Sequence, residues 1–211
     1  MSRLEDAPFR RGETYFNGEQ INAPPTGEFL GGYNYEGHEY DFLDEWYGSG
    51  LNIRVRVLRN SSAYNLLPGQ LVTFTGTRVL DSSPVLLGTN AGAVAATEAA
   101  YCLPVDELLP AGGVPSGDLF YAVVSGPCLL TTAKSPASGN VNIAIGQKVV
   151  SCTGSATTDG NEGAVIGQDL SAATTGPETT IANQINNAVG RALSATTTAQ
   201  TGTAILVAIG W

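Results

Sequence analysis

Five carboxylates within ten residues form the densest group of side chains that could do acid–base chemistry. They are Glu36, Glu39, Asp41, Asp44 and Glu45, and they alternate with Tyr40, Phe42 and Trp46. Paired carboxylates beside aromatic rings are typical of glycoside hydrolysis. A glycosidase, however, draws its carboxylates from separate strands of a preformed cleft, whereas these follow one another along a single segment. We therefore interpret them as a polar rim around aromatic anchors of a protein interface, and we predict no catalytic residue.

The remaining reactive residue types are too sparse or wrongly spaced for a known site. His38 is the single histidine, and no GxSxG, GxGxxG or GxxxxGK[ST] motif occurs. The chain has an odd number of cysteines and no CxxC motif: the three are Cys102, Cys128 and Cys152. We therefore predict that each is a small, buried apolar side chain. The stretch 159–163 resembles a calcium loop but lacks its ligand spacing. We expect no enzyme activity, no metal and no cofactor.

Charge and hydropathy limit the kinds of partner. The 211 residues carry a net charge of −9, with only ten Lys and Arg, which argues against binding the phosphate backbone of a nucleic acid. There is no apolar run of about 18 residues, so we expect no contact with a membrane. The first residues lack the apolar stretch of a signal peptide, which predicts a protein made and kept in a cytoplasm.

The chain divides near residue 50 into two regions of different chemistry. Residues 1–50 hold ten of the sixteen aromatic residues, and ten acids against three arginines give them a net charge of −7. Residues 51–211 hold nine acids and seven bases, for −2. We predict a long, mostly irregular N-terminal arm (residues 1–50) and a β domain (residues 51–211). Division of the β domain into two subregions, 51–117 and 118–211, is left open.

An acidic segment this rich in aromatic rings differs from a disordered tail, which lacks them. Because the arm has no regular period and contains several prolines and glycines, we expect it to become ordered only against another surface. Packing on its own β domain is the alternative. The predicted interface residues are Phe9, Arg10, Arg11, Tyr15, Phe16, Phe29, Tyr33, Tyr35, Tyr40, Phe42, Trp46, Tyr47, Arg54, Arg56 and Trp211.

Residues 51–58 alternate apolar and polar with period two, which predicts a half-buried strand with Arg54 and Arg56 on one face. Two like charges on one face call for acidic partners, so we expect carboxylates of an arm, its own or a neighbour's, beside them. Further short strands are predicted at 69–75, 77–80, 119–125, 128–132, 148–152, 164–168, 188–193 and 203–209. One helical turn is predicted between Pro104 and Pro110.

Short strands separated by Gly-, Ser-, Thr- and Pro-rich turns indicate an all-β fold, a small β-barrel or sandwich. Trp211 follows the last apolar strand, so we expect it to be buried against the barrel or a neighbour.

Several stretches of the second half resemble the phage head decoration, or capsid cement, proteins, whose barrel is β-tulip-like. Residues 118–130 (DLFYAVVSGPCLL) resemble the opening of that barrel, and 146–150 (GQKVV) its G-x-x-V step. Residues 165–167 and 189–193 (VGRAL) are similar to a later strand, and 203–211 (TAILVAIGW) to the closing one. The likeness covers residues 118–211.

This resemblance implies a structural virion protein on the outer capsid surface, assembled in the host cytoplasm. Its partners would be the major capsid protein and itself, commonly as a homo-trimer, with a dimer as the other possibility. Bridging neighbouring capsid subunits would stabilise the shell through many weak contacts. A phage fibre or host-recognition protein is the alternative, and a hydrolase or carbohydrate-binding module is a third reading.

Overall fold

The computed structural model describes residues 7, 9–14, 37–43, 52–60, 65–75, 83–86, 102–133, 142–151, 163–168, 188–196 and 203–210. Every regular element among them is a strand, which confirms the all-β class. The strands are β1 (Glu39–Leu43), β2 (Asn52–Arg59), β3 (Leu71–Thr75), β4 (Ser83–Leu86), β5 (Leu103–Pro104), β6 (Leu119–Thr131), β7 (Lys148–Ser151), β8 (Val165–Gly167), β9 (Ala188–Ala192) and β10 (Ala204–Ile209).

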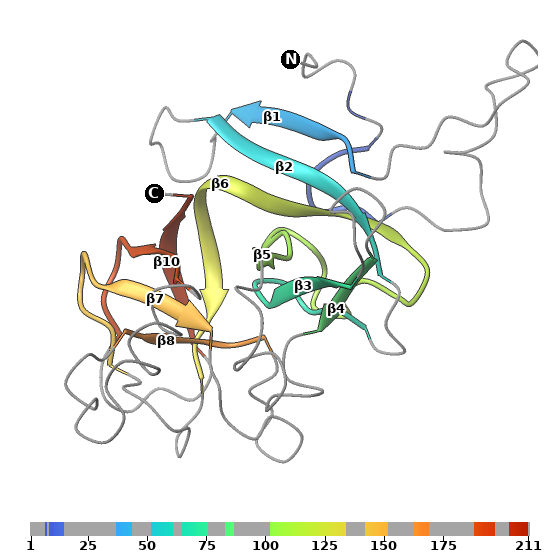
Figure 1. The fold of residues 1–211 in the computed structure, drawn as a ribbon. Coiled ribbons are helices and arrows are strands. Elements are labelled where there is room, and N and C mark those ends of the chain that lie inside the picture. The colour runs from blue at the N-terminus through green and yellow to red at the C-terminus, as the bar shows by residue number, and fades with distance from the viewer. Residues whose placement is uncertain are drawn as a thin grey trace, which may run out of the picture.

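Seven strands form one antiparallel sheet in the order β1-β2-β6-β10-β9-β7-β8, and β4-β3-β5 form a smaller one (Figure 1). Of the two predicted architectures, barrel or sandwich, the barrel is not found, because the large sheet is not closed among the described residues. In that part of the chain, one isolated parallel bridge, between Val165 of β8 and Thr132 directly after β6, connects the two ends of this part of the sheet. A ladder of several residues would be needed there to close the sheet.

Strand β6 joins the two halves of the large sheet. Its residues 119–125 pair with β2, whereas residues 126–131 pair with β10. The strand bends between these two halves in Figure 1. Gly126 lies at the change of partner with φ +112°, a value that L side chains rarely adopt. The sequence predicts two strands here because the Gly–Pro pair interrupts the apolar run, but the backbone stays in one strand through the bend.

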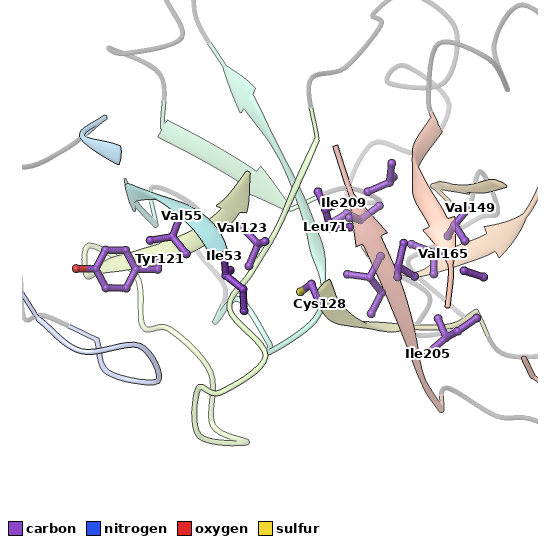
Figure 2. Close-up of a cluster of buried hydrophobic side chains, with 14 of the residues drawn as sticks. Ile53, Val55, Leu71, Tyr121, Val123, Cys128, Val149, Val165, Ile205 and Ile209 are labelled. Atoms are coloured by element: carbon purple, nitrogen blue, oxygen red, sulfur yellow. The ribbon is translucent and has the colours of Figure 1, made fainter. Parts of the chain in front are cut away.

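Both faces of the first half of β6 are buried. Leu119, Tyr121 and Val123 belong to the main core, whereas Phe120 and Ala122 pack under the small sheet. Figure 2 shows the main core extending from Ile53, Val55 and Tyr121 past Cys128 to Val149, Val165 and Ile205. Since successive side chains of a strand point to opposite faces, the unbroken apolar run LFYAVV is what a doubly covered strand requires.

The pattern of β2 confirms the period-two prediction. Ile53, Val55 and Val57 are fully buried and face the main core, whereas Arg54 is exposed on the other face. The predicted strands at β3, β7, β8, β9 and β10 are also present. One local prediction is wrong: the expected helical turn after Pro104 is a bridge at Val105 followed by a tight turn. The arm, predicted as mostly irregular, also contains a short strand, β1, that the sequence did not predict.

Candidate functional site

Residues 9–14, which we call the N-terminal clasp, pack against the β domain of the same chain. The ring of Phe9 stacks on that of Tyr121, with centroids 4.2 Å apart and planes inclined by 22°. The Tyr121 hydroxyl donates a hydrogen bond of 2.9 Å to the Phe9 carbonyl oxygen. Both residues are buried, Phe9 being 6% exposed. The aromatic anchor is thus held by ring contact and a backbone hydrogen bond together.

Arg11 attaches the clasp to two buried carboxylates in the turn after β5. Its guanidinium donates to Asp106 Oδ1 at 2.6 Å and to Glu107 Oε1 at 3.0 Å. The three side chains are only 8%, 1% and 5% exposed. Burial by itself lowers the pKa of Arg11, but the two carboxylates outweigh it and the net pKa is raised. A buried charge needs such compensation, so clasp and turn depend on each other.

The backbone of the clasp completes this contact. The Gly12 amide donates to Asp106 Oδ2 at 2.9 Å, so both carboxylate oxygens of Asp106 accept bonds from the clasp. Gly12 has φ +82°, and a Cβ atom there would lie 2.9 Å from the Leu108 carbonyl oxygen. Only glycine allows the chain to approach the turn this closely.

Glu107 also links the clasp to the core through Cys128. The Cys128 thiol donates to Glu107 Oε2 at 3.1 Å. Burial, and then the Glu107 charge, raise the pKa of Cys128, while burial raises that of Cys102 to about 12. Both thiols are therefore protonated at neutral pH and are poor nucleophiles. The prediction of a buried side chain is confirmed for Cys128, whereas Cys102 is partly buried against the same core; Cys152 lies outside the described residues.

Strand β1 brings two more aromatic residues of the arm to Tyr121. Tyr40 and Phe42 meet its ring edge-on, with centroids 6.2 and 5.5 Å away. Tyr40 is 4% exposed, and Phe42 packs partly buried against the same core. Three arm residues that are far apart in sequence, Phe9, Tyr40 and Phe42, therefore converge on one side chain of β6.

The expected acidic partners of Arg54 and Arg56 are present on β1. The register places Asp41 opposite Arg54 and Glu39 opposite Arg56. Arg54 Nε donates to Asp41 at 3.0 Å, and Arg56 donates to Glu39 from both Nε and a terminal nitrogen. The hydrogen bond to Asp41 and its charge raise the pKa of Arg54. The carboxylates come from the chain's own arm, and their role is that of cross-strand pairs.

The described parts of the arm thus favour the alternative in which it packs on its own β domain. Phe9, Arg11 and Tyr40, predicted as interface anchors, are occupied by contacts within the chain, and Arg10 is exposed. The sequence reasoning missed Tyr121, Asp106 and Glu107, although two adjacent acids inside the apolar stretch 103–109 are a signal of buried charge. The other predicted positions lie outside the described residues: Tyr15, Phe16, Phe29, Tyr33, Tyr35, Trp46, Tyr47 and Trp211.

A different part of the surface carries exposed apolar side chains that sequence reasoning did not select. Ile145 is 71% exposed at the tip of the turn before β7, and Leu193 is 47% exposed directly after β9. The exposed side chain of Arg191 lies nearby on β9, opposite Lys148 of β7. We call Ile145, Lys148, Arg191 and Leu193 the turn patch.

The residues that the structure describes contain neither a metal site nor a membrane-spanning helix. No group of three or more His, Cys, Asp or Glu side chains is arranged to hold a metal ion in that part of the chain. No helix there is long and apolar enough to cross a membrane.

No family model matches the sequence, and no curated protein matches it either. Among solved structures, the chain is similar to the N-terminal base of the head fibre protein gp8.5 of bacteriophage phi29. The match covers 75% of this chain and 94% of that one, with 13% identity and a TM-score of 0.35. A likeness of this degree concerns the course of part of the backbone only.

Proposed function

We propose that this chain is a structural, non-enzymatic protein of a phage virion that decorates the outer capsid surface. The observation that carries the proposal is the arrangement of the stretches that resemble capsid cement proteins. They lie in β6, β7, β8, β9 and β10, and these five strands are neighbours in one uninterrupted part of the sheet.

The chemistry of the described residues supports a structural role. Within the carboxylate-rich stretch, Glu39 and Asp41 are engaged by Arg56 and Arg54 across β1 and β2. A glycosidase needs two carboxyl groups facing a common cleft, with one kept protonated. Glu39 and Asp41 instead each pair with an arginine of the neighbouring strand, so we favour assembly over hydrolysis.

In the proposed role, copies of the chain bind neighbouring major capsid subunits and hold them together. Each contact can be weak, because several contacts made by one oligomer act together. A homo-oligomer, with a trimer as the form implied by the resemblance, would supply that multiplicity. The protein would assemble on shells in the host cytoplasm and need no cofactor.

The direct test adds the purified chain to capsids that lack it and measures co-sedimentation and the temperature at which the shells open. We expect binding that saturates at a fixed ratio to the major capsid protein and a higher opening temperature. Shells incubated without the chain are the control. Binding at only a few positions per shell, with no change in opening temperature, would favour the fibre or host-recognition alternative. Absence of binding would contradict both.

A further inference from the structure

The turn that presents Ile145 is rigidly built although its tip is apolar. The Gln147 amide donates to the Ala144 carbonyl at 3.1 Å, and Gly146, with φ +81°, occupies the position that a type II turn reserves for glycine. The Gln147 side chain accepts from the Ala144 amide at 2.9 Å and donates to the Gln168 carbonyl at 2.8 Å. Because the backbone that carries Ile145 is already ordered by these bonds, little backbone entropy is lost when a partner covers the turn.

Leu193 lies beside this turn on the neighbouring segment. The Gly146 amide donates to the Ala192 carbonyl at 2.8 Å, and the Ala192 amide donates to the Gln147 carbonyl at 2.9 Å. Because side chains alternate along a strand and Ala192 is buried, Leu193 and Arg191 share the outer face. Two exposed apolar side chains and a cation are thus fixed on adjacent backbone segments.

The charges of the turn patch are unbalanced. Lys148 and Arg191 lie directly opposite each other on β7 and β9, and like charges at such positions are destabilising. Neither makes an ion pair with the residues that the structure describes, and the Arg191 guanidinium donates only to the Gly146 carbonyl, at 3.1 Å. On β2, the comparable pair Arg54 and Arg56 is matched by carboxylates of β1.

We propose that the turn patch is a docking surface for a second copy of this chain, whose acidic N-terminal region supplies the missing negative charge. Residues 1–50 carry −7, whereas the patch combines two cations with two exposed apolar side chains. The contact joins different surfaces of the two copies, so it repeats head to tail and closes only if the rotation between copies allows a ring. This deepens the proposed function, because it names the surface through which the oligomer forms.

The test is sedimentation equilibrium of the full chain at low and high salt. We expect self-association that weakens as salt rises, since charges contribute to the contact. Leu193→Ser and Ile145→Ser should each lower the association constant about tenfold or more, as expected for central apolar contacts. Leu67→Ser is the matched control, because Leu67 is 42% exposed on another part of the surface. It should leave association unchanged.

The variant Lys148→Glu distinguishes an effect on self-association from an effect on the stability of the fold. It places a carboxylate opposite Arg191, so the melting temperature should stay unchanged or rise by up to about 3 °C. Association should nevertheless fall about tenfold or more, because the patch loses its positive charge. Equal association of Lys148→Glu and the unaltered chain would overturn the inference.

The inference and the proposed function can fail separately. A chain that stays monomeric at all concentrations but still coats capsids overturns the docking surface and leaves the decoration role intact. A chain that associates through the turn patch and ignores capsids overturns the decoration role alone.

Discussion

At the scale of single residues, Tyr121 explains how the arm is attached. The ring of Phe9 stacks on the Tyr121 ring, and the rings of Tyr40 and Phe42 contact it edge-on. The Tyr121 hydroxyl donates a hydrogen bond to the backbone of the clasp. Burial raises the pKa of this hydroxyl above its ordinary value of 10.0. A side chain that is both aromatic and a hydrogen-bond donor can serve all these contacts, which phenylalanine cannot.

The first prediction concerns alkaline pH. Because the pKa of Tyr121 is higher in the folded state, folded chains keep this proton where unfolded chains lose it. Its contribution to the free energy of unfolding is therefore full below about pH 10 and falls as pH rises further. Tyr121→Phe should cost about 1 kcal/mol at pH 8 by removing the bond to Phe9 and should reduce the alkaline loss. Urea unfolding from pH 8 to 11 measures both effects; parallel curves would contradict the assignment.

The second prediction tests the buried ion cluster. Arg11→Ala leaves Asp106 and Glu107 buried without their cation, so the free energy of unfolding should fall by about 3–5 kcal/mol. Arg10→Ala is the matched control, since Arg10 is the exposed neighbour and should change little. Urea denaturation of the two variants at pH 7 makes the comparison. Equal stabilities would show that the Arg11 contacts do not hold the clasp.

Residue types alone predicted some of the ion pairs but not the buried cluster of Arg11. The like charges of Arg54 and Arg56 were enough to predict acidic partners, because strand periodicity places both on one face. The contacts of Arg11 could not be predicted, because its partners lie 95 and 96 residues away and local patterns carry no information about such distances. The aromatic content of the arm correctly indicated burial of Phe9 and Tyr40 but could not indicate which surface would bury them.

At the scale of elements, strand β6 organises the molecule by serving two partners in succession. The bend at Gly126 directs its first half along β2 and its second half along β10, and the main core lies along both (Figures 1 and 2). A Cβ atom at Gly126 would lie 3.1 Å from the Asn52 carbonyl oxygen and from Ile53 Cα. Backbone conformation and packing thus both require glycine.

The third prediction follows from this bend. Gly126→Ala should lower the free energy of unfolding by about 1–3 kcal/mol, because the backbone angle is strained for alanine and β2 is close. Gly112→Ala is the control, since its Cβ would meet no atom within 4 Å. Thermal or urea unfolding distinguishes the two. A Gly126→Ala variant as stable as Gly112→Ala would mean that β2 and β6 adjust freely at the bend.

Strand positions were predicted better than strand partners. Alternation and apolar runs identified β2, β3, β7, β8, β9 and β10, because those patterns depend on local geometry. The open sheet order depends on where β6 bends and on which edges remain unpaired, and these are long-range properties. Strand β1 was missed because its sequence, EYDFL, reads as an acidic cluster unless its pairing with Arg54 and Arg56 is known.

At the scale of the whole molecule, the clasp and β1 make the described parts of the arm integral to the fold. An arm at residues 1–50 and a β domain at 51–211, as the sequence predicts, would mean that the β domain stays stable when the arm is removed. The structure changes that expectation, because the deletion uncovers Tyr121 and leaves Asp106 and Glu107 without Arg11. The arm therefore contributes to stability whatever else it binds.

The fourth prediction measures that contribution. A chain without residues 1–14 should be destabilised at least as much as Arg11→Ala, because it loses both Phe9 and Arg11. A chain without residues 1–6 keeps the clasp and is the matched control. Melting temperatures from circular dichroism compare the two deletions. If both melt like the full chain, the clasp is not part of the stable fold.

The central claim is that the chain is an abundant structural component of the capsid surface. It is tested most directly by counting copies of the chain in purified particles of the phage that encodes it, by quantitative mass spectrometry against the major capsid protein. We expect a fixed ratio that is a sizeable fraction of the number of capsid subunits. Absence from the particle, or a few copies only, would contradict the claim.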